Sequence, residues 1–369
     1  MTLIYKPIKF PKDNFPHKTI IEWWYFNCHL KDSKGKKYSL MNCLFKANNK
    51  KVNIPLINKL PFETIYFSHS QLTDIDNKKF YSEINPLSII SYDSFNRDLV
   101  YINYTNPSLK GYLNCVIEEI KPFVFHIKSF FCDLILTSIK KPLLVGKTGF
   151  VKLNKKSTYY YSLTKLETNG YIFVKNKPIK VKGISWMDHQ WANEPYSKDK
   201  WTWFCFQLNN NTEIVCFEYD DKIKKTYLAT INYPNGTQKT FSDIKIVPTQ
   251  HFWKSQKTGA QYPLQWNIEI PQANVSLQTT ALLKNQEMIF GEIIYWEGPT
   301  NVCGTFNNHK VVGNGFMELV GFPVEKSKIE IFKSELKERL NNIFHLYIKK
   351  FVHQKFPIIK KFSKFIPNI

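Results

Sequence analysis

Between about Glu22 and Phe322 the chain alternates short aromatic and β-branched runs with clusters of Asn, Asp, Gly and Pro. Strict alternation places apolar side chains on one face of a strand, and turn-forming clusters separate one strand from the next. The segment Tyr233-Pro-Asn-Gly-Thr237 has an Asn-Gly pair between two such runs, which predicts a hairpin turn. We therefore predict that this part of the chain is all-β.

The strand pattern repeats within the chain. The segment Glu22-Trp-Trp-Tyr-Phe-Asn-Cys-His-Leu30 aligns with Lys200-Trp-Thr-Trp-Phe-Cys-Phe-Gln-Leu208, and a polar turn and a second strand pattern follow each. Near the end of each half, Lys180–Met187 resembles Val312–Glu318 around a shared Gly. Such a repeat indicates duplication of one antiparallel unit, and units of this size commonly close into barrels that leave no strand edge exposed.

The repeat predicts two antiparallel β-barrels, in residues 1–188 and 189–324, with their seam near residue 188. After Phe322 the pattern changes, because apolar residues recur at helical spacing and lysines fill many other positions. Residues 325–369 are predicted to form a basic amphipathic helical tail. Such a helix either lies on an anionic membrane surface or packs on a barrel with its lysines in solvent. Both alternatives stay open.

Charge and cysteine usage narrow the classes of partner and location. The 369 residues carry 51 Lys and Arg against 30 Asp and Glu, a net charge of +21 that favours an anionic partner. No nucleic-acid reader motif occurs, so we expect no nucleic-acid partner.

The seven cysteines lack a CxxC pair and are interpreted as reduced core residues, and the N-terminus lacks the apolar stretch of a signal peptide. We expect a cytoplasmic protein that can also associate peripherally with a membrane.

The densest candidate chemistry lies in Gly183-Ile-Ser-Trp-Met-Asp-His-Gln-Trp191. Trp186 and Trp191 bracket Asp188 and His189, and aromatic enclosure raises the pKa of a carboxyl group so that it can act as an acid. In the structural alternative, Asp188 caps the turn between the barrels. No P-loop, HExxH, CxxC pair or nucleophile elbow occurs, so we expect neither a metal nor another cofactor.

Three Trp-rich motifs follow one another in a fixed order: Glu22–Leu30, Trp186-Met-Asp-His-Gln-Trp191, and Tyr295-Trp-Glu-Gly-Pro299 with Gly315–Gly321. Together they resemble the two-domain, lipocalin-like family that contains the AttH-like proteins and the carotenoid 1,2-hydratases. The resemblance covers about residues 15–322. It implies two lipocalin-like barrels and an apolar, elongated ligand, often an isoprenoid or a polyene, bound in a barrel or between the barrels.

The hydratase members imply cofactor-independent hydration of a C=C bond, and other members imply isomerase or cyclase chemistry. Hydration needs an acid that protonates carbon, an aromatic wall that tolerates the cation, and a base that activates water. From the resemblance we carry over His189, Trp191, Tyr219 and Asp221, although Asp220 matches the last position equally. We assign the acid to Asp221 or Asp188 and the base to His189. The expected ligand-binding residues are Glu22, Trp24, Tyr25, Trp186, Trp191 and Trp203.

Two alternatives come from other classes of protein. In one, the chain is a non-catalytic lipid carrier or chaperone-like lipocalin at a membrane surface, and in the other it is a scaffold with filled barrels. The tryptophans can also be barrel core, His69 a core histidine, and Glu22 an ion-pair partner for a Lys or Arg. Free volume that touches Asp188 and its neighbours favours an enzyme, whereas filled barrels favour a scaffold.

Overall fold

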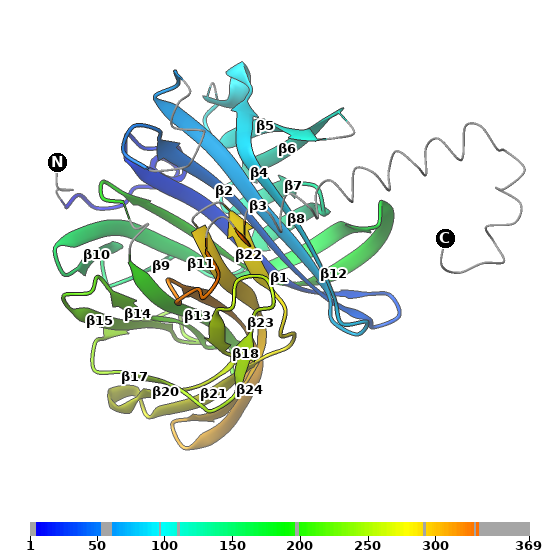
Figure 1. Cartoon of the computed structure of the whole chain (residues 1–369). Helices are drawn as coiled ribbons and strands as arrows, with labels where there is room; N and C mark the ends of the chain where they lie inside the picture. Colours follow the sequence, from blue (N-terminus) through cyan, green and yellow to red (C-terminus); the bar gives the residue numbers. More distant parts are fainter. Residues whose placement is uncertain are drawn as a thin grey trace, which may run out of the picture. The chain divides into compact units, whose positions relative to one another are not determined.

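The computed structural model describes residues 5–52, 61–95, 97–108, 111–195, 199–290, 293–327 and 330–331. Its regular structure is almost entirely antiparallel β-sheet, which confirms the all-β prediction (Figure 1). The two large sheets belong to one compact unit, and Ser255–Ala260 belongs with the segment that begins at Val324 to a second unit. Among the described residues, no helix has the length and apolar character needed to cross a membrane.

The first sheet contains twelve strands. Its strands follow the chain from β1 to β8, and β12 lies beside β1. Strand β11 pairs with both β12 and β8, and this second pairing closes the sheet into a barrel. The strands are β1 (Ile21–Asp32), β2 (Lys37–Asn48), β3 (Thr64–Asp74), β4 (Lys79–Ile90), β5 (Tyr101–Ser108), β6 (Gly111–Lys121), β7 (Val124–Lys128), β8 (Cys132–Ser138), β9 (Leu143–Leu144), β10 (Phe150–Leu153), β11 (Lys156–Val174) and β12 (Lys177–Ala192).

The barrel interior is a packed hydrophobic core. Alternate residues of β1, from Trp24 to Leu30, face this core together with side chains from the surrounding strands. The N-terminal segment inserts Asn14, at the end of the short helix η1 (Lys12–Asn14), into the same core. Trp24 Nε1 donates to the Asn14 carbonyl at 3.0 Å, and the Tyr161 hydroxyl donates to Asn14 Oδ1 at 2.7 Å. The N-terminal segment is therefore an integral part of the barrel.

The second sheet has ten strands and repeats the order of the first. Its path runs from β16 through β15, β14, β13, β24, β23, β21 and β20 to β17, with β22 beside β23. The lipocalin-like antiparallel arrangement is confirmed. Unlike the first sheet, the hydrogen-bonded path of the described strands in this sheet ends at β16 and β17, which have only four residues each. The strands are β13 (Lys200–Leu208), β14 (Glu213–Asp220), β15 (Lys225–Asn232), β16 (Gln238–Phe241), β17 (Lys245–Pro248), β20 (Gln265–Ile270), β21 (Val275–Ala281), β22 (Glu287–Phe290), β23 (Ile293–Phe306) and β24 (His309–Val320).

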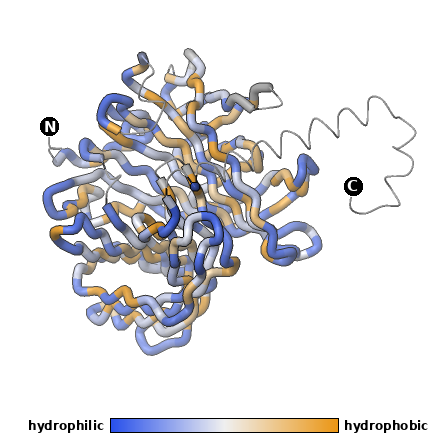
Figure 2. The backbone as a smooth tube through the Cα atoms, in the orientation of Figure 1, coloured by the Kyte–Doolittle hydropathy of each residue, from blue (hydrophilic) through white to orange (hydrophobic). Residues whose placement is uncertain are grey.

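Smaller elements complete the described chain. Strands β18 (Phe252–Lys254) and β19 (Gln261–Pro263) form a separate hairpin, and η3 (Tyr92–Phe95) and η4 (Pro271–Ala273) are short 3-10 turns. In Figure 2 the hairpin turns are mostly hydrophilic, and the strands between them carry the hydrophobic positions. All seven cysteines are free thiols, as predicted, but Cys303 is exposed rather than buried because it lies on the opposite face of its strand from the buried Val302.

The internal repeat has a direct structural counterpart. The order β12-β1-β2-β3 in the first sheet matches β24-β13-β14-β15 in the second. Equivalent residues of the two repeats meet: Tyr25 and Trp203 pack edge to face at 5.8 Å, and Asn27 Nδ2 lies 3.4 Å from Cys205 Sγ. The central strands β1 and β13 therefore face each other between the sheets.

Strand register shows which residues of the two repeats are equivalent. Tyr25 pairs with Asp188 across β1 and β12, and its equivalent Trp203 pairs with Glu318 across β13 and β24. Asp188 and Glu318 are therefore equivalent residues of the two repeats. By the same register Gly183 is equivalent to Gly313, so Gly313 is the counterpart of Gly183 among the residues from Val312 to Glu318.

The first sheet extends beyond the predicted boundary between the two halves. Strand β12 continues through residue 188 and ends at Ala192, four residues beyond that boundary.

Only the start of the predicted helical tail lies among the described residues. After Pro323, Ser327 and Glu330 form a reciprocal cap, with the Glu330 carboxylate accepting from the Ser327 backbone at 2.8 Å. The remainder of the predicted helical tail, residues 328–329 and 332–369, lies outside the described residues, and its membrane contact stays a prediction.

Candidate functional site

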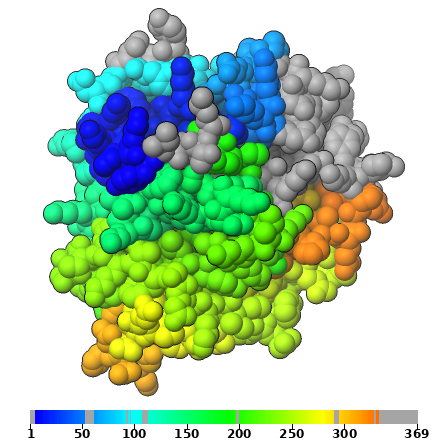
Figure 3. All heavy atoms as spheres, turned by 90° about the vertical axis from the view of Figure 1, so that its left-hand side faces the viewer, coloured from blue at the N-terminus to red at the C-terminus, as the bar shows by residue number. Residues whose placement is uncertain are grey.

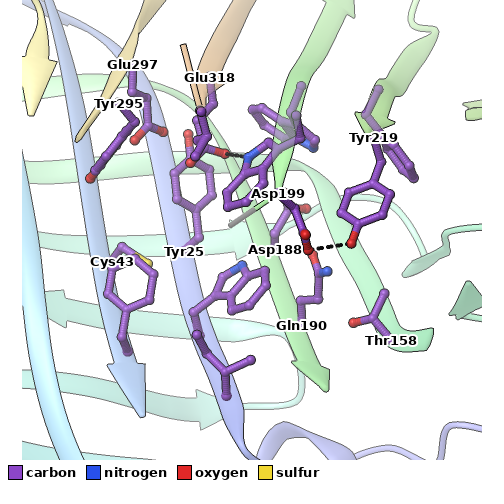
Figure 4. A pocket seen from close by; sticks show the side chains of 18 of the residues that line it. Tyr25, Cys43, Thr158, Asp188, Gln190, Asp199, Tyr219, Tyr295, Glu297 and Glu318 are labelled. Atoms are coloured by element: carbon purple, nitrogen blue, oxygen red, sulfur yellow. Dashed lines mark hydrogen bonds between the residues drawn. The ribbon is translucent and has the colours of Figure 1, made fainter. Parts of the chain in front are cut away.

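A pocket of about 230 Å³ lies between the two sheets. Its walls come from β1, β2, β3, β10, β11 and β12 of the first sheet and from β13, β14, β23 and β24 of the second. The lining is rich in aromatic rings and also contains four carboxyl groups. The aromatic rings include Trp23, Tyr25, Trp201, Trp203, Tyr219 and Tyr295. The carboxyl groups are those of Asp188, Asp199, Glu297 and Glu318 (Figure 4).

Strand alternation divides the predicted site between two faces of the first sheet. Successive side chains of a strand point to opposite faces. On β12, Asp188 lines the pocket, whereas His189 and Trp191 face the barrel interior. On β1, Tyr25 lines the pocket, whereas Trp24 is part of the barrel core. The acid and imidazole that adjoin in the sequence therefore belong to different environments.

Asp188 is buried and is held by three donors. Tyr160 donates to Oδ2 at 2.8 Å, and the Ser162 hydroxyl and Trp186 Nε1 donate to Oδ1 at 2.5 and 2.7 Å. Burial raises the pKa of Asp188 to about 7, although these hydrogen bonds oppose the shift. Asp188 lies within β12 and so does not cap a turn between the barrels. Because both carboxyl oxygens are engaged, Asp188 is better placed to anchor its neighbours than to transfer a proton.

One of those neighbours orients an aromatic wall of the pocket. The Trp203 indole N–H donates to the Tyr160 hydroxyl at 2.9 Å, and that hydroxyl donates in turn to Asp188. Trp203 therefore presents its ring to the pocket from a fixed position, with Tyr25 packed edge to face beside it. The predicted ligand-binding residues Tyr25 and Trp203 both line the pocket, whereas Trp186 packs in the apolar layer between the sheets.

Glu297 and Glu318 face each other across β23 and β24. Burial raises the pKa of Glu297 well above its usual value, and the Glu318 charge raises it further, while a hydrogen bond with Tyr25 opposes the shift. Within the described part of the chain, Glu297 Oε1 is buried and has no hydrogen-bond partner. Burial also raises the pKa of Glu318 to about 7, and Trp201 Nε1 donates to its Oε2 at 3.1 Å. At neutral pH the pair retains at least one proton.

The pocket has two further polar groups at its edges. The Tyr219 hydroxyl donates to Asp199 Oδ2 at 2.6 Å, and Lys156 forms an ion pair with the same carboxylate. In Figure 4 these groups lie on the opposite side of the pocket from Glu297 and Tyr295. Near Glu297, His69 Nδ1 lies 2.7 Å from the Tyr295 hydroxyl, and burial lowers the pKa of His69 to about 3, so the imidazole is neutral.

The remaining predicted site residues lie elsewhere. Asp221 follows β14 in a surface turn, where its carboxylate accepts from the Lys224 backbone at 2.9 Å and from Asn154 at 2.8 Å, and it is not among the pocket residues. Trp24, Trp191, His189 and Glu22 gather inside one end of the barrel, and Glu22 forms an ion pair with Lys46 at 3.3 Å. Tyr219 lies in the pocket as expected.

Sequence reasoning gave no weight to the Glu297 and Glu318 pair. Both residues stand inside motifs that carried the family resemblance, Tyr295-Trp-Glu-Gly-Pro299 and Gly315–Gly321. Alternation within each motif does not show that two acids pair across strands. A repeat alignment that matched Gly183 to Gly313 would have made Glu318 the counterpart of Asp188 and so identified it.

Glu318 predicts a pH dependence of stability. Its pKa is about 7 in the folded protein against 4.5 for an ordinary Glu, so the folded state holds the proton more tightly than the unfolded chain. Its contribution is therefore fully present below about pH 4.5 and is lost as the pH rises towards about 7. We expect the melting temperature to fall over this range, and to fall less in Glu318→Gln.

Calorimetry of both proteins between about pH 4 and 8 measures this difference. Glu269→Gln, which removes an exposed carboxylate that pairs with Lys245, serves as the control and keeps the slope of the unmodified protein. Equal slopes in Glu318→Gln and the unmodified protein would contradict the prediction.

Comparison with known proteins agrees with the fold and the motifs. A family model described as AttH-like matches residues 3–322. Dehydratase asqC of Emericella nidulans is 25% identical over 201 residues, which cover 51% of this chain and 57% of the relative. Kievitone hydratase of Fusarium solani subsp. phaseoli is 25% identical over 205 residues, which cover 51% and 56%. The chain thus spans little more than half the length of these relatives.

Solved structures show the same fold. An AttH structure from Nitrosomonas europaea superposes with a TM-score of 0.67 at 21% identity, covering 87% of this chain and 99% of that one. Kievitone hydratase from Nectria haematococca gives a TM-score of 0.63 at 16% identity and covers 85% and 93%. Because the family model spans nearly the whole described chain, the chain belongs to the AttH-like family.

Proposed function

We propose that the pocket between the sheets catalyses addition of water to a C=C bond, or the reverse dehydration, by acid–base chemistry without a cofactor. The observation that carries this proposal is the Glu297 and Glu318 pair, two neighbouring carboxyls that share raised pKa values on the wall of an aromatic pocket. One protonated carboxyl supplies an acid, and its ionised partner supplies a base.

In the hydration direction, protonated Glu297 gives its proton to one carbon of the double bond, and the π electrons form the new C–H bond. Water adds to the cationic carbon that results, and the Glu318 carboxylate takes the proton that this water loses. Proton exchange between the two carboxyls restores the starting state. The alkene and one water are consumed, and one alcohol is formed.

The aromatic lining suits the cation in this mechanism. Trp203 and Tyr25 flank the pocket beside Glu297, and an aromatic face stabilises a nearby cation by about 0.5–2 kcal/mol. A tertiary cation, as formed from the branched end of an isoprenoid chain, needs the least further stabilisation. Asp188 takes the role of a positioning residue that holds Tyr160 and Trp203, in place of the acid role considered from the sequence.

The size of the pocket limits the substrate. A volume of about 230 Å³ is below the range of about 300–1,000 Å³ usual for drug-sized ligands. The proposed substrate therefore places a short branched alkene, the reacting end of an isoprenoid or polyene, in the pocket. The names of the relatives, a dehydratase and a hydratase, support water addition or removal as the reaction class.

The test uses the purified full chain in oxygen-18 water. Candidate substrates are alkenes with a terminal isoprenoid unit and the matching tertiary alcohols, and mass spectrometry follows incorporation of the label into alcohol and loss of water from alcohol. Labelled alcohol, or dehydration of the alcohol, supports the proposal. Tight binding of these compounds without turnover would overturn the proposal and favour the carrier alternative. The absence of both binding and turnover would also overturn the proposal.

A further inference from the structure

Away from the pocket, three side chains with metal-binding atoms converge inside one end of the barrel. They are His17 of the N-terminal segment, Glu22 of β1 and His189 of β12. One ligand atom from each lies within 4.8 Å of the others. Glu22 Oε1 is 2.7 Å from His17 Nδ1 and 3.0 Å from His189 Nε2. Glu22 and His189 are fully buried, whereas His17 is 20% exposed.

Of the two Glu22 carboxylate oxygens, Oε1 contacts the two imidazole rings. The other oxygen, Oε2, accepts from the His17 backbone N–H at 2.8 Å and from Lys46 at 3.3 Å. Glu22 Oε1 therefore faces both rings, which is a suitable arrangement for a cation ligand.

Both imidazole rings are held in place by stacking. His17 stacks on Trp191 with ring centres 3.9 Å apart and planes within 6°, and His189 stacks on Trp24 at 4.8 Å. His17 Nε2 also lies 3.4 Å from Asp13 Oδ1. A carboxylate on the outer nitrogen of a ligating histidine is the usual second shell of a metal site, because it fixes the tautomer and the ring orientation.

We propose that His17, Glu22 and His189 bind one divalent transition-metal ion, with Zn²⁺ the best match to two imidazoles and a carboxylate. The ion replaces the hydrogen-bonding protons on His17 Nδ1 and His189 Nε2, and each neutral imidazole then carries its proton on its other ring nitrogen. Glu22 and Asp13 offset two of the three positive charges of the ion and Lys46. A fourth position is completed by water.

One of the three proposed ligands also reaches the protein surface. His17 lines an outer pocket with Asp13, Lys12, Arg97 and Asp98. Figure 3 shows the N-terminal residues in dark blue on the surface, next to the cyan residues near position 100. Since His17 belongs to the N-terminal segment and the other two ligands to the barrel wall, the ion would tie that segment to β1 and β12.

The test measures metal binding by the full chain after treatment with a chelator. We expect one Zn²⁺ per chain by calorimetric titration, a rise in melting temperature on Zn²⁺ addition, and the visible absorption of protein-bound Co²⁺ when Co²⁺ is the probe. His17→Gln removes a partly exposed ligand and should weaken Zn²⁺ binding at least 100-fold. Asp13→Asn alters only the carboxylate beside His17 Nε2 and should weaken Zn²⁺ binding by about 10- to 100-fold.

His126→Gln is the matched control, because His126 also lies near carboxylates, 2.8 Å from Asp133 and 3.8 Å from Glu118, at the surface. It should bind Zn²⁺ as the unmodified chain does. Binding that survives His17→Gln but is lost in His126→Gln would place the ion at the surface and overturn the proposal. Absence of stoichiometric binding by the folded, unmodified chain would also overturn it, leaving a hydrogen-bonded cluster only.

Discussion

Replacing Glu297 by glutamine should lower turnover in the pocket by about 100- to 10,000-fold, the usual contribution of a general acid or base. Glutamine has nearly the same shape as glutamic acid but cannot give a proton to carbon. Because burial and the Glu318 charge keep Glu297 protonated, the substitution exchanges one neutral group for another. The variant should therefore fold as the unmodified protein does, and the loss should fall on kcat rather than on KM.

Steady-state kinetics with the substrate found in the labelling assay, together with circular dichroism of the variant, check this expectation. Asp221→Asn is the matched control, because it removes a carboxylate that lies in a surface turn. It should keep full activity. If Glu297→Gln retained activity within about tenfold, or if Asp221→Asn lost as much as Glu297→Gln, the assignment of the acid to the paired carboxyls would be wrong.

Gly183→Ala should destabilise the protein by about 3 kcal/mol or more, which is near the upper end for a substitution that overpacks a core. A Cβ atom at Gly183 would lie 1.9 Å from the His29 carbonyl oxygen and 2.9 Å from Leu30 Cα, both backbone atoms of β1. Backbone atoms cannot rotate away as a side chain does, so β1 and β12 would have to separate where Gly183 faces His29 and Leu30.

Urea unfolding followed by fluorescence measures the change. Gly35→Asn provides the control, because no atom lies within 4 Å of the added Cβ and asparagine tolerates the positive φ of 81° at this turn. Gly313→Ala, at the equivalent position of the second repeat and 2.3 Å from the Gln207 carbonyl oxygen, should also be destabilising. A loss below about 1 kcal/mol in Gly183→Ala would contradict the close approach of the two strands.

Much of the fold was predictable because its signals are periodic. Alternation identified the strands, and the repeat of Glu22–Leu30 in Lys200–Leu208 anticipated the two central strands β1 and β13. Barrel closure was less predictable. In the first sheet it depends on the length of β11, which reaches both β12 and β8. In the second sheet the hydrogen-bonded path of the described strands ends at the short strands β16 and β17.

The candidate site was predictable only in part. Asp188 and Trp203 were identified from their motifs and line the pocket, but the adjacent His189 faces the other side of the sheet. Sequence proximity does not distinguish the two faces of a strand when both faces are apolar and aromatic. Glu297 and Glu318 become a pair only through the register of β23 and β24, and no local pattern contains that register.

Because the two repeats meet at β1 and β13, side chains of both sheets line the pocket. A compound that fills it contacts side chains of both sheets and binds only when both are folded. By mass action, a ligand at 100 times its dissociation constant then adds about 2.7 kcal/mol to the free energy of unfolding of the whole two-sheet unit. Thermal-shift screening of small branched alkenes and alcohols can therefore find ligands for this pocket before any reaction has been measured.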